Sequence, residues 1–375
     1  MFGYQAGGPL AVVVRNDRVV GVVPDGELPA GPDGPELDAA GRAVVPGFVD
    51  AHTHLVFAGD RADEFAARLT PLSGQYETGG IWRTVEATRA APFDELVEDT
   101  LGRARACLAG GTTTIEVKSG YGLETAHERR LLEVIAEVGT RTPAELVPTF
   151  LGAHLAPTPD YVDYVIEEML PACAELAVSC DAFCDEGALT VEQAGRVLAA
   201  GRAHGLALRI HAEELAHTGG ARLAAELRCQ SADHLVHATE ADADLLFTAG
   251  VVAVLLPATS FSLRSAYAPA RMLADAGVTL ALATDCNPGT SYTTSMPFVI
   301  ALACSQYGLT VDEAVRAATL GGARALGRDD IGHLWPGAAA DLAVLDADHW
   351  VDLAYRPGMP IVSTVVKDGE VVVGR

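Results

Sequence analysis

Short apolar runs rich in β-branched residues alternate with amphipathic helical segments along most of this 375-residue chain, from Ala43 to Gly327. Apolar positions recur at helical spacing in segments such as Asp94–Ala109 and Glu124–Gly139, whereas the runs between them are short and continuous. Strands that alternate with helices are typical of parallel α/β architecture, and eight such strands close into a barrel. The eight predicted strands are 44–51, 113–117, 145–151, 178–183, 207–210, 232–236, 251–256 and 278–283. We therefore predict an α/β fold, a (β/α)8 TIM-like barrel.

The two ends of the chain carry a different pattern, that of antiparallel hairpins. Residues 10–23 form a candidate hairpin around Asn16-Asp17, and residues 341–370 hold further short strands that lead to a Lys367-Asp368-Gly369-Glu370 turn. A two-stranded hairpin is marginally stable alone, so we expect both ends to combine into one small β-sandwich domain. The predicted division is a composite β module from residues 1–45 and 337–375, and a barrel from residues 46–336.

Charge and composition exclude several classes of partner. The chain has 50 acidic and 26 basic residues, a formal net charge of −24, whereas nucleic acids and anionic membranes require basic patches. Seven cysteines without repeated close spacing fit a reduced protein better than a disulfide-linked one. We find no stretch that resembles a signal peptide or a membrane span. We expect a soluble cytoplasmic protein that binds a small molecule, neither nucleic acid nor membrane.

Polar residues follow the predicted strands at their carboxyl ends, which is the face where barrel active sites are built. His52 and His54 follow the first strand, and their spacing puts both side chains on one face of an extended chain. The other candidates are Lys118, Tyr121, His154, His211, Glu214, His234 and Asp285. Imidazoles with a carboxylate suit Zn²⁺ or Fe²⁺ and leave room for a water, whose pKa falls from about 15.7 toward about 7 on such a metal. The sequence therefore predicts metal-assisted hydrolysis.

Longer motifs around these residues resemble those of the amidohydrolase superfamily. The resemblance is carried by Pro46-Gly47-Phe48-Val49-Asp50-Ala51-His52-Thr53-His54, by the histidine after strand five and by the aspartate after strand eight. Lys118-Ser119-Gly120-Tyr121-Gly122 and Asp285-Cys286-Asn287-Pro288-Gly289-Thr290 are similar to motifs of the imidazolonepropionase family within it. This resemblance implies hydrolytic opening of 4-imidazolone-5-propanoate to N-formimidoyl-L-glutamate, a step of histidine degradation, with one divalent metal in the barrel mouth.

The resemblance also implies a role for each site residue. The metal ligands would be His52, His54, His211 and Asp285, and the catalytic residues would be Glu214, His234 and Asp285. The substrate would contact Arg61, Tyr121, His154, Glu214, Asn287, Gly289 and Thr290. Among these, Arg61 is expected to bind the substrate carboxylate, because a guanidinium offers two parallel donors to its two oxygens. Either Glu214 or Asp285 must deliver a proton to the leaving nitrogen.

Several alternatives stay open at the level of sequence. Zinc is the expected metal and iron the alternative, and barrels of this kind commonly form homodimers. A strand lysine such as Lys118 is carboxylated in hydantoinase-like relatives, although pairing with Glu116 is the simpler expectation. Another mononuclear amidohydrolase, such as a deaminase of a heterocyclic amine, is the nearest enzymatic rival, and a non-catalytic binding protein would lack ligands that are present here. The N-terminal β segment and the predicted loop from residue 70 to residue 89 are both short for the family.

Overall fold

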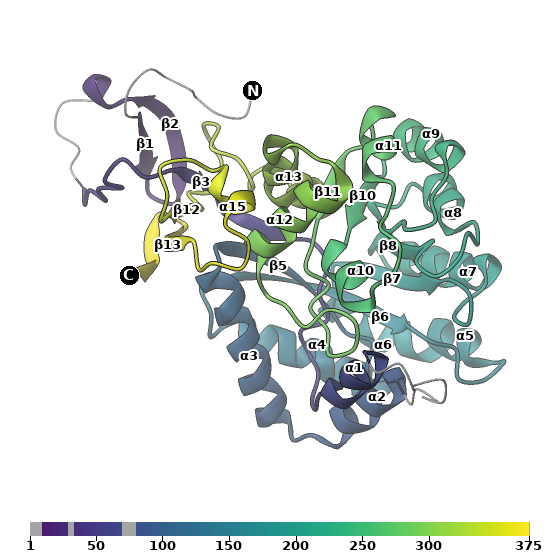
Figure 1. The fold of residues 1–375 in the computed structure, drawn as a ribbon. Coiled ribbons are helices and arrows are strands. Elements are labelled where there is room, and N and C mark those ends of the chain that lie inside the picture. The colour runs from purple at the N-terminus through teal and green to yellow at the C-terminus, as the bar shows by residue number, and fades with distance from the viewer. Residues whose placement is uncertain (1–9, 29–33, 70–79, 375) are drawn as a thin grey trace.

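The computed structural model describes residues 10–28, 34–69 and 80–374, and its centre is an eight-stranded sheet (Figure 1). All of the pairings within this sheet are parallel, in the order β11-β10-β9-β8-β7-β6-β5-β4. The strands are β4 (Phe48–Asp50), β5 (Thr112–Lys118), β6 (Glu145–Ala153), β7 (Ser179–Cys184), β8 (Ala207–Ala212), β9 (Ser231–His234), β10 (Val252–Leu255) and β11 (Leu280–Leu282). A parallel bridge between Thr53 and Cys286 joins the segments that follow β4 and β11, which nearly closes the sheet. The predicted (β/α)8 barrel is confirmed.

Helices follow the barrel strands and surround them (Figure 1). The longer ones are α2 (Gly80–Ala90), α3 (Phe93–Ala109), α4 (Thr125–Gly139), α7 (Val191–Ala203), α8 (Gly220–Leu227), α9 (Glu240–Ala249) and α12 (Met296–Tyr307). The shorter ones are α1 (Ala62–Arg68), α5 (Tyr161–Tyr164), α6 (Leu170–Cys173), α10 (Pro257–Leu263), α11 (Ala270–Asp275), α13 (Val311–Arg316), α14 (Gly322–Ala325) and α15 (Asp352–Tyr355). Across the described ranges, we find no helix with the length and apolar character that a bilayer crossing requires.

Helical spacing of apolar residues explains why these segments pack on the barrel. In α4, Leu131, Ile135 and Val138 are buried, and residues three and four apart lie on one face of a helix. Helix starts are fixed by capping boxes, for example at α7, where the Thr190 hydroxyl accepts from the backbone N–H of Gln193 and the Gln193 side chain accepts in return. The apolar face and the cap together fix which part of the chain turns from strand to helix.

Two antiparallel sheets lie beside the barrel (Figure 1). One has the order β14-β13-β12-β3 and combines β3 (Val44–Pro46) with β12 (Leu342–Leu345), β13 (Val362–Lys367) and β14 (Glu370–Gly374). The other is the hairpin of β1 (Leu10–Arg15) and β2 (Arg18–Pro24), which bonds to the C-terminal segment through Val19 N–H and Ala338 O at 2.8 Å. The two ends of the chain therefore meet, and we keep the division into residues 1–45 with 337–375 and residues 46–336 as a proposal.

The single strand predicted over residues 44–51 is wrong, because two strands occupy this range. β3 pairs with β12 in the antiparallel sheet, and β4 pairs with β5 in the barrel. The chain changes sheets at Gly47, where an added Cβ would lie 2.3 Å from the Thr113 hydroxyl oxygen. A larger residue at this position would require the buried Thr113 side chain to move.

The predicted loop over residues 70–89 is also wrong in its second half, since Gly80–Ala90 is the helix α2. Its buried residues Thr84, Val85 and Thr88 lie on one side, and the Thr88 hydroxyl accepts from the backbone N–H of Ala58 at 3.1 Å. Glycines at its start concealed this helical spacing in the sequence. The first half of the predicted loop, residues 70–79, lies outside the described residues.

Candidate active site

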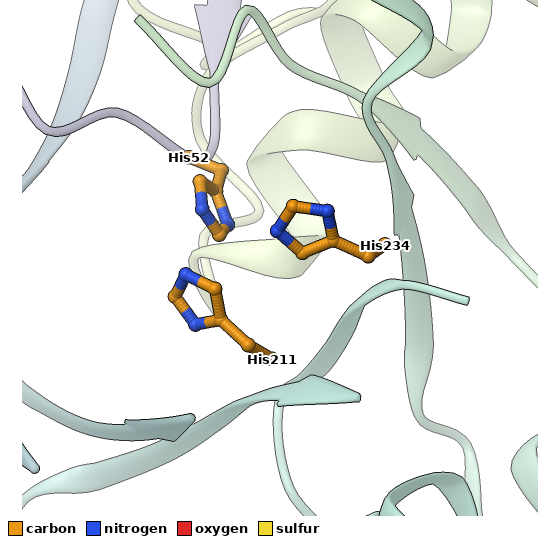
Figure 2. Close-up of side chains that lie close together, drawn as sticks. All are labelled: His52, His211 and His234. Carbon is orange, nitrogen blue, oxygen red and sulfur yellow. The ribbon is translucent and has the colours of Figure 1, made fainter. Parts of the chain in front are cut away.

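Histidines from three barrel strands converge at the carboxyl ends of the sheet. His52 and His54 follow β4, His211 lies in β8, and His234 ends β9. Figure 2 shows the rings of His52, His211 and His234 turned toward one another. All four histidines are buried. The barrel thus brings together residues that are up to 182 positions apart in the chain.

The candidate ligand atoms form two overlapping groups, one of His52, His211 and His234 and one of His52, His54 and Asp285. Within each group the ligand atoms lie within 4.8 Å of one another. Asp285 Oδ1 is 3.6 Å from His52 Nε2 and 3.5 Å from His54 Nε2, and His211 Nε2 is 3.5 Å from His54 Nε2. The Nε2 atoms of His52 and His234 are buried with no hydrogen-bond partner among the described residues. Inward-facing nitrogens without partners, beside a carboxylate, fit a divalent cation of the zinc or iron type.

Carboxylates behind the ligands set the orientation of the rings. His52 Nδ1 lies 2.6 Å from Asp233 Oδ2, and His211 Nδ1 lies 3.2 Å from Asp181 Oδ1. A carboxylate at Nδ1 holds the ring proton there and leaves Nε2 with a lone pair for a metal. Burial lowers the pKa values of His52, His54 and His234, so these three imidazoles are neutral at pH 7.

A fully buried network of charges supports those carboxylates. Lys118 Nζ lies 2.8 Å from both Glu116 Oε1 and Asp181 Oδ2, and Arg209 Nη2 lies 3.4 Å from Asp233 Oδ2. Burial alone would lower the pKa of Lys118, but Asp181 and Glu116 raise it above its usual value, so the side chain is an ammonium ion. Carboxylation of a lysine requires the neutral amine. The geometry therefore favours a structural ion pair at Lys118.

Glu214 lies at the edge of the histidine cluster, with Oε1 3.6 Å from His234 Nδ1. Burial, together with the nearby Asp285 carboxylate, raises the pKa of Glu214 to about 8. Burial also raises the pKa of Asp285, to about 6, although a hydrogen bond from the Thr259 hydroxyl at 2.6 Å opposes this shift. Without a bound cation, Glu214 is therefore protonated over a wider pH range than Asp285.

The segment that carries Glu214 is held by a buried carboxylate that the sequence did not single out. Asp185, just after β7, accepts from the backbone N–H groups of Glu214, Leu215 and Ala216 at 2.6, 3.0 and 3.1 Å. Thr259, in the helix after β10, likewise orients Asp285 through its hydroxyl. These two residues follow the fourth and seventh barrel strands, after which the candidates predicted from the sequence include no residue. The acidic pair Asp185-Glu186 directly after an apolar strand was the available signal.

Tyr121 and His154, two predicted substrate contacts, flank the histidine cluster. Their rings are 5.5 Å apart, and the His154 ring stacks on His54 with centroids 5.2 Å apart. His154 Nδ1 lies 3.0 Å from the carbonyl oxygen of Gly120, so Nδ1–H donates to this oxygen and Nε2 is left as an acceptor. Burial lowers the pKa of His154 to about 4, so the ring is neutral.

The remaining predicted contacts gather around the turn after Asp285. The Asn287 side chain is occupied within this turn, because its Oδ1 accepts from the backbone N–H groups of Gly289 and Thr290 at 2.8 Å each. Arg61 packs against Gly289, where an added Cβ would lie 2.0 Å from Arg61 Nη1. Its Nε and Nη2 are 2.8 and 2.7 Å from Glu64 Oε2. The structure thus brings all the predicted site residues into one region.

Comparisons with known proteins agree with this geometry. A sequence model described as the amidohydrolase family matches residues 43–372. The imidazolonepropionase of Mycolicibacterium smegmatis is 51% identical over 369 residues, which cover 96% of this chain and 90% of the relative. The imidazolonepropionase of Streptomyces coelicolor is 52% identical over 366 residues, which cover 96% of this chain and 91% of the relative.

Two solved structures show the same fold at low sequence identity. A 5-methylcytosine deaminase from Klebsiella pneumoniae, liganded with 5-fluorocytosine, has a TM-score of 0.80 at 16% identity and covers 99% of this chain and 95% of its own. An atrazine chlorohydrolase from Arthrobacter aurescens, complexed with zinc, has a TM-score of 0.74 at 20% identity, and the match covers 97% of this chain and 90% of the chlorohydrolase. At this identity the likeness concerns the fold alone.

Proposed function

The chain belongs to the amidohydrolase family, and from this premise we propose that it hydrolyses 4-imidazolone-5-propanoate to N-formimidoyl-L-glutamate, a step of histidine degradation. It is a metal-dependent hydrolase of the imidazolonepropionase type. The observation that carries the proposal is the convergence of His52, His54, His211 and Asp285 at one end of the barrel, in a chain about half identical to imidazolonepropionases over 96% of its length.

The donor set supports one divalent metal held by His52, His54, His211 and Asp285. We propose zinc, and iron is the alternative because imidazole and carboxylate ligands suit both ions. A divalent metal there would supply Lewis acidity and would lower the pKa of a water toward neutrality. The buried carboxylates Asp233 and Asp181, at the Nδ1 atoms of His52 and His211, support this assignment.

Glu214 is the proton donor in this proposal. Opening the ring breaks a C–N bond, and the departing nitrogen must gain a proton as the bond breaks. In the protein without metal, burial raises the pKa of Glu214 to about 8 and that of Asp285 to about 6, so Glu214 holds its proton more readily than Asp285 at neutral pH. His234, neutral and 3.6 Å from Glu214, supports the attacking water. Burial of these groups excludes bulk water and strengthens each interaction.

Tyr121 and His154 orient the substrate ring in the proposal, since their own rings lie beside His54. The turn of Asn287, Gly289 and Thr290, with Arg61 packed on it, receives the propanoate tail. We further propose a cytoplasmic homodimer. All seven cysteines are free thiols, which fits a reducing compartment.

The decisive experiment follows the products formed by the purified protein from imidazolone propionate, before and after chelation and with zinc or iron added back. N-formimidoyl-glutamate without free ammonia is expected, and activity should return with the metal. Release of ammonia would identify a deaminase instead. Full activity in the metal-free protein would refute the metal-dependent mechanism.

A matched pair of variants tests the role of Glu214. Glu214→Gln is expected to bind metal normally and to lose at least about 100-fold in kcat, the usual scale of general acid–base catalysis. Glu226→Gln, an exposed carboxylate in an i,i+4 pair with Arg222 on α8, is the control and should keep wild-type kinetics. Retained kcat in Glu214→Gln would assign proton delivery to another group.

A further inference from the structure

The hydrogen-bond donors expected to hold the substrate carboxylate are largely engaged with protein groups. Two nitrogens of Arg61 bond to Glu64 Oε2 at 2.8 and 2.7 Å, in a pair whose side chains are 14% and 10% exposed. The backbone N–H groups of Gly289 and Thr290 both donate to Asn287 Oδ1. Asn287 Nδ2 donates to the carbonyl of Asp285 at 2.7 Å. An anionic tail that reached this turn would need a further donor.

Arg68, the last residue of α1, supplies such a donor. Its Nη2 donates to the carbonyl of Gly289 at 2.9 Å, so the guanidinium lies on the same turn as that of Arg61. Its Nε is buried and has no hydrogen-bond partner among the described residues. A buried N–H without a partner is unfavourable unless something accepts from it. The atom therefore indicates a place for an acceptor.

The spacing along the chain explains why two arginines meet there. Arg61 is the N-cap of α1 and Arg68 follows seven residues later, and residues seven apart lie on the same side of a helix, two turns from each other. Glu64 lies between them, one turn from Arg61. The face of α1 toward Gly289 thus carries two guanidinium groups and one carboxylate.

Counting these charges gives a net charge of +1 beside the Gly289 turn. Arg61 and Glu64 neutralise each other, and no second carboxylate within the described part of the chain pairs with Arg68. Burial and the repulsion of Arg61 lower the pKa of Arg68 from its usual value, as expected for a guanidinium whose charge is incompletely balanced. One carboxylate ligand would make the cluster neutral, whereas a neutral ligand would leave the charge unbalanced.

We propose that Arg68 is a second substrate-binding arginine, whose Nε–H donates to the carboxylate of the propanoate tail. In this arrangement the Arg61–Glu64 pair forms the wall of the subsite. Arg68 then selects ring substrates that carry a carboxylate over neutral ones. The inference rests on the proposed function for the identity of the ligand, and on the Arg68 contacts for the location of its carboxylate.

Binding of two probes to the metal-loaded protein tests this directly by calorimetry. Imidazole-4-propanoate carries the ring and the carboxylate and cannot be hydrolysed, and 4-methylimidazole carries the ring alone. Arg68→Met should lower the affinity for the carboxylate probe by about 10- to 100-fold, the range for a hydrogen bond to a charged group. The affinity for the neutral probe should be unchanged. Arg68→Lys keeps the positive charge but lacks the planar guanidinium, so it should lose less affinity for the carboxylate probe than Arg68→Met.

The control is Arg83→Met. Arg83 lies on α2 and forms an exposed ion pair with Asp63, which lies on α1 as Arg68 does. This variant should change the affinity for either probe by no more than about twofold, because exposed ion pairs contribute little. In the kinetics, Arg68→Met should raise KM for imidazolone propionate and change kcat by less than about threefold. If Arg68→Met lowered the affinity for both probes equally, its role would be merely structural. Unchanged affinity for both probes would also overturn the proposal. If the wild type binds the carboxylate probe but does not open the imidazolone ring, the proposed function fails and the Arg68 inference does not.

Discussion

Removal of one acceptor atom at Asp185 should disable Glu214 without disturbing the metal ligands. The Asp185 carboxylate is 4% exposed and accepts four backbone N–H groups, from Glu186 at 2.7 Å and from Glu214, Leu215 and Ala216. Asparagine retains one acceptor oxygen and presents an NH₂ group at the other position. Whichever way the amide turns, two of the four donors lose their acceptor and face another donor.

The magnitude follows from these contacts. Hydrogen bonds to a charged acceptor are worth about 1.5–3 kcal/mol each. An NH₂ group in place of Oδ2 removes the bonds from Glu214 and Leu215, about 3–6 kcal/mol in all. An NH₂ group in place of Oδ1 removes the bonds from Glu186 and Ala216, and only the second, about 1.5–3 kcal/mol, holds residues 214–216. Glu213, which precedes them, has φ of +54° and is costly to hold in place. The segment is expected to open rather than to keep unpaired donors, and kcat of Asp185→Asn should fall about 10- to 100-fold. The metal ligands after β4, in β8 and after β11 do not depend on this segment, so bound metal should be unchanged.

A double-mutant cycle decides whether Asp185 acts through Glu214. Steady-state kinetics and metal content are compared for the wild type, Asp185→Asn, Glu214→Gln and the double variant. If Asp185 only positions Glu214, the double variant should be no slower than Glu214→Gln alone. Asp275→Asn, an exposed carboxylate paired with Arg271, is the control and should behave as the wild type. Fully additive losses, or loss of metal from Asp185→Asn, would refute the reasoning.

Further predictions concern the metal, the buried lysine and pH. His211→Ala should lose bound metal and turnover together, whereas Arg61→Ala should keep the metal and raise KM; a full equivalent of metal in His211→Ala would contradict the ligand assignment. Lys118→Met leaves Glu116 and Asp181 without their cation and should lower the free energy of unfolding by about 3–5 kcal/mol in urea titrations, and added bicarbonate should not raise wild-type activity. In metal-free protein, the raised pKa of Glu214 favours its neutral form, so this group's contribution to stability is present below about pH 4.5 and is lost as pH rises to about 8, by at most about 5 kcal/mol. Glu214→Gln should lack that loss, and parallel pH–stability curves for the two proteins would show that Glu214 is not buried as described.

Local pattern was sufficient for the barrel because each strand and helix carries its own signal. The run rich in β-branched residues at 113–117 matches β5 closely, and the helical spacing in Glu124–Gly139 matches α4. Prediction failed where local signals were mixed. Pro46-Gly47 lies inside one apolar run and divides it between two sheets, and the glycines at residues 79 and 80 concealed the start of α2.

The sequence by itself determined the candidate chemistry. His52, His54, His211 and Asp285 stand at strand ends, and the carboxyl ends of parallel strands share one face of a barrel. The outcome depends on strand order and direction, which the alternating pattern already specifies.

Only the tertiary structure decided which groups orient and balance these residues. Asp185 holds the Glu214 segment, Asp233 and Asp181 hold the histidine rings, and Glu64 engages Arg61, so that no second carboxylate among the described residues pairs with Arg68. Apart from the local Arg61–Glu64 pair, these contacts join residues 29 to 181 positions apart at separations of 2.6 to 3.2 Å. No periodicity encodes them, because a shift of one side-chain rotamer or one turn changes the partner while the hydrophobic pattern stays the same.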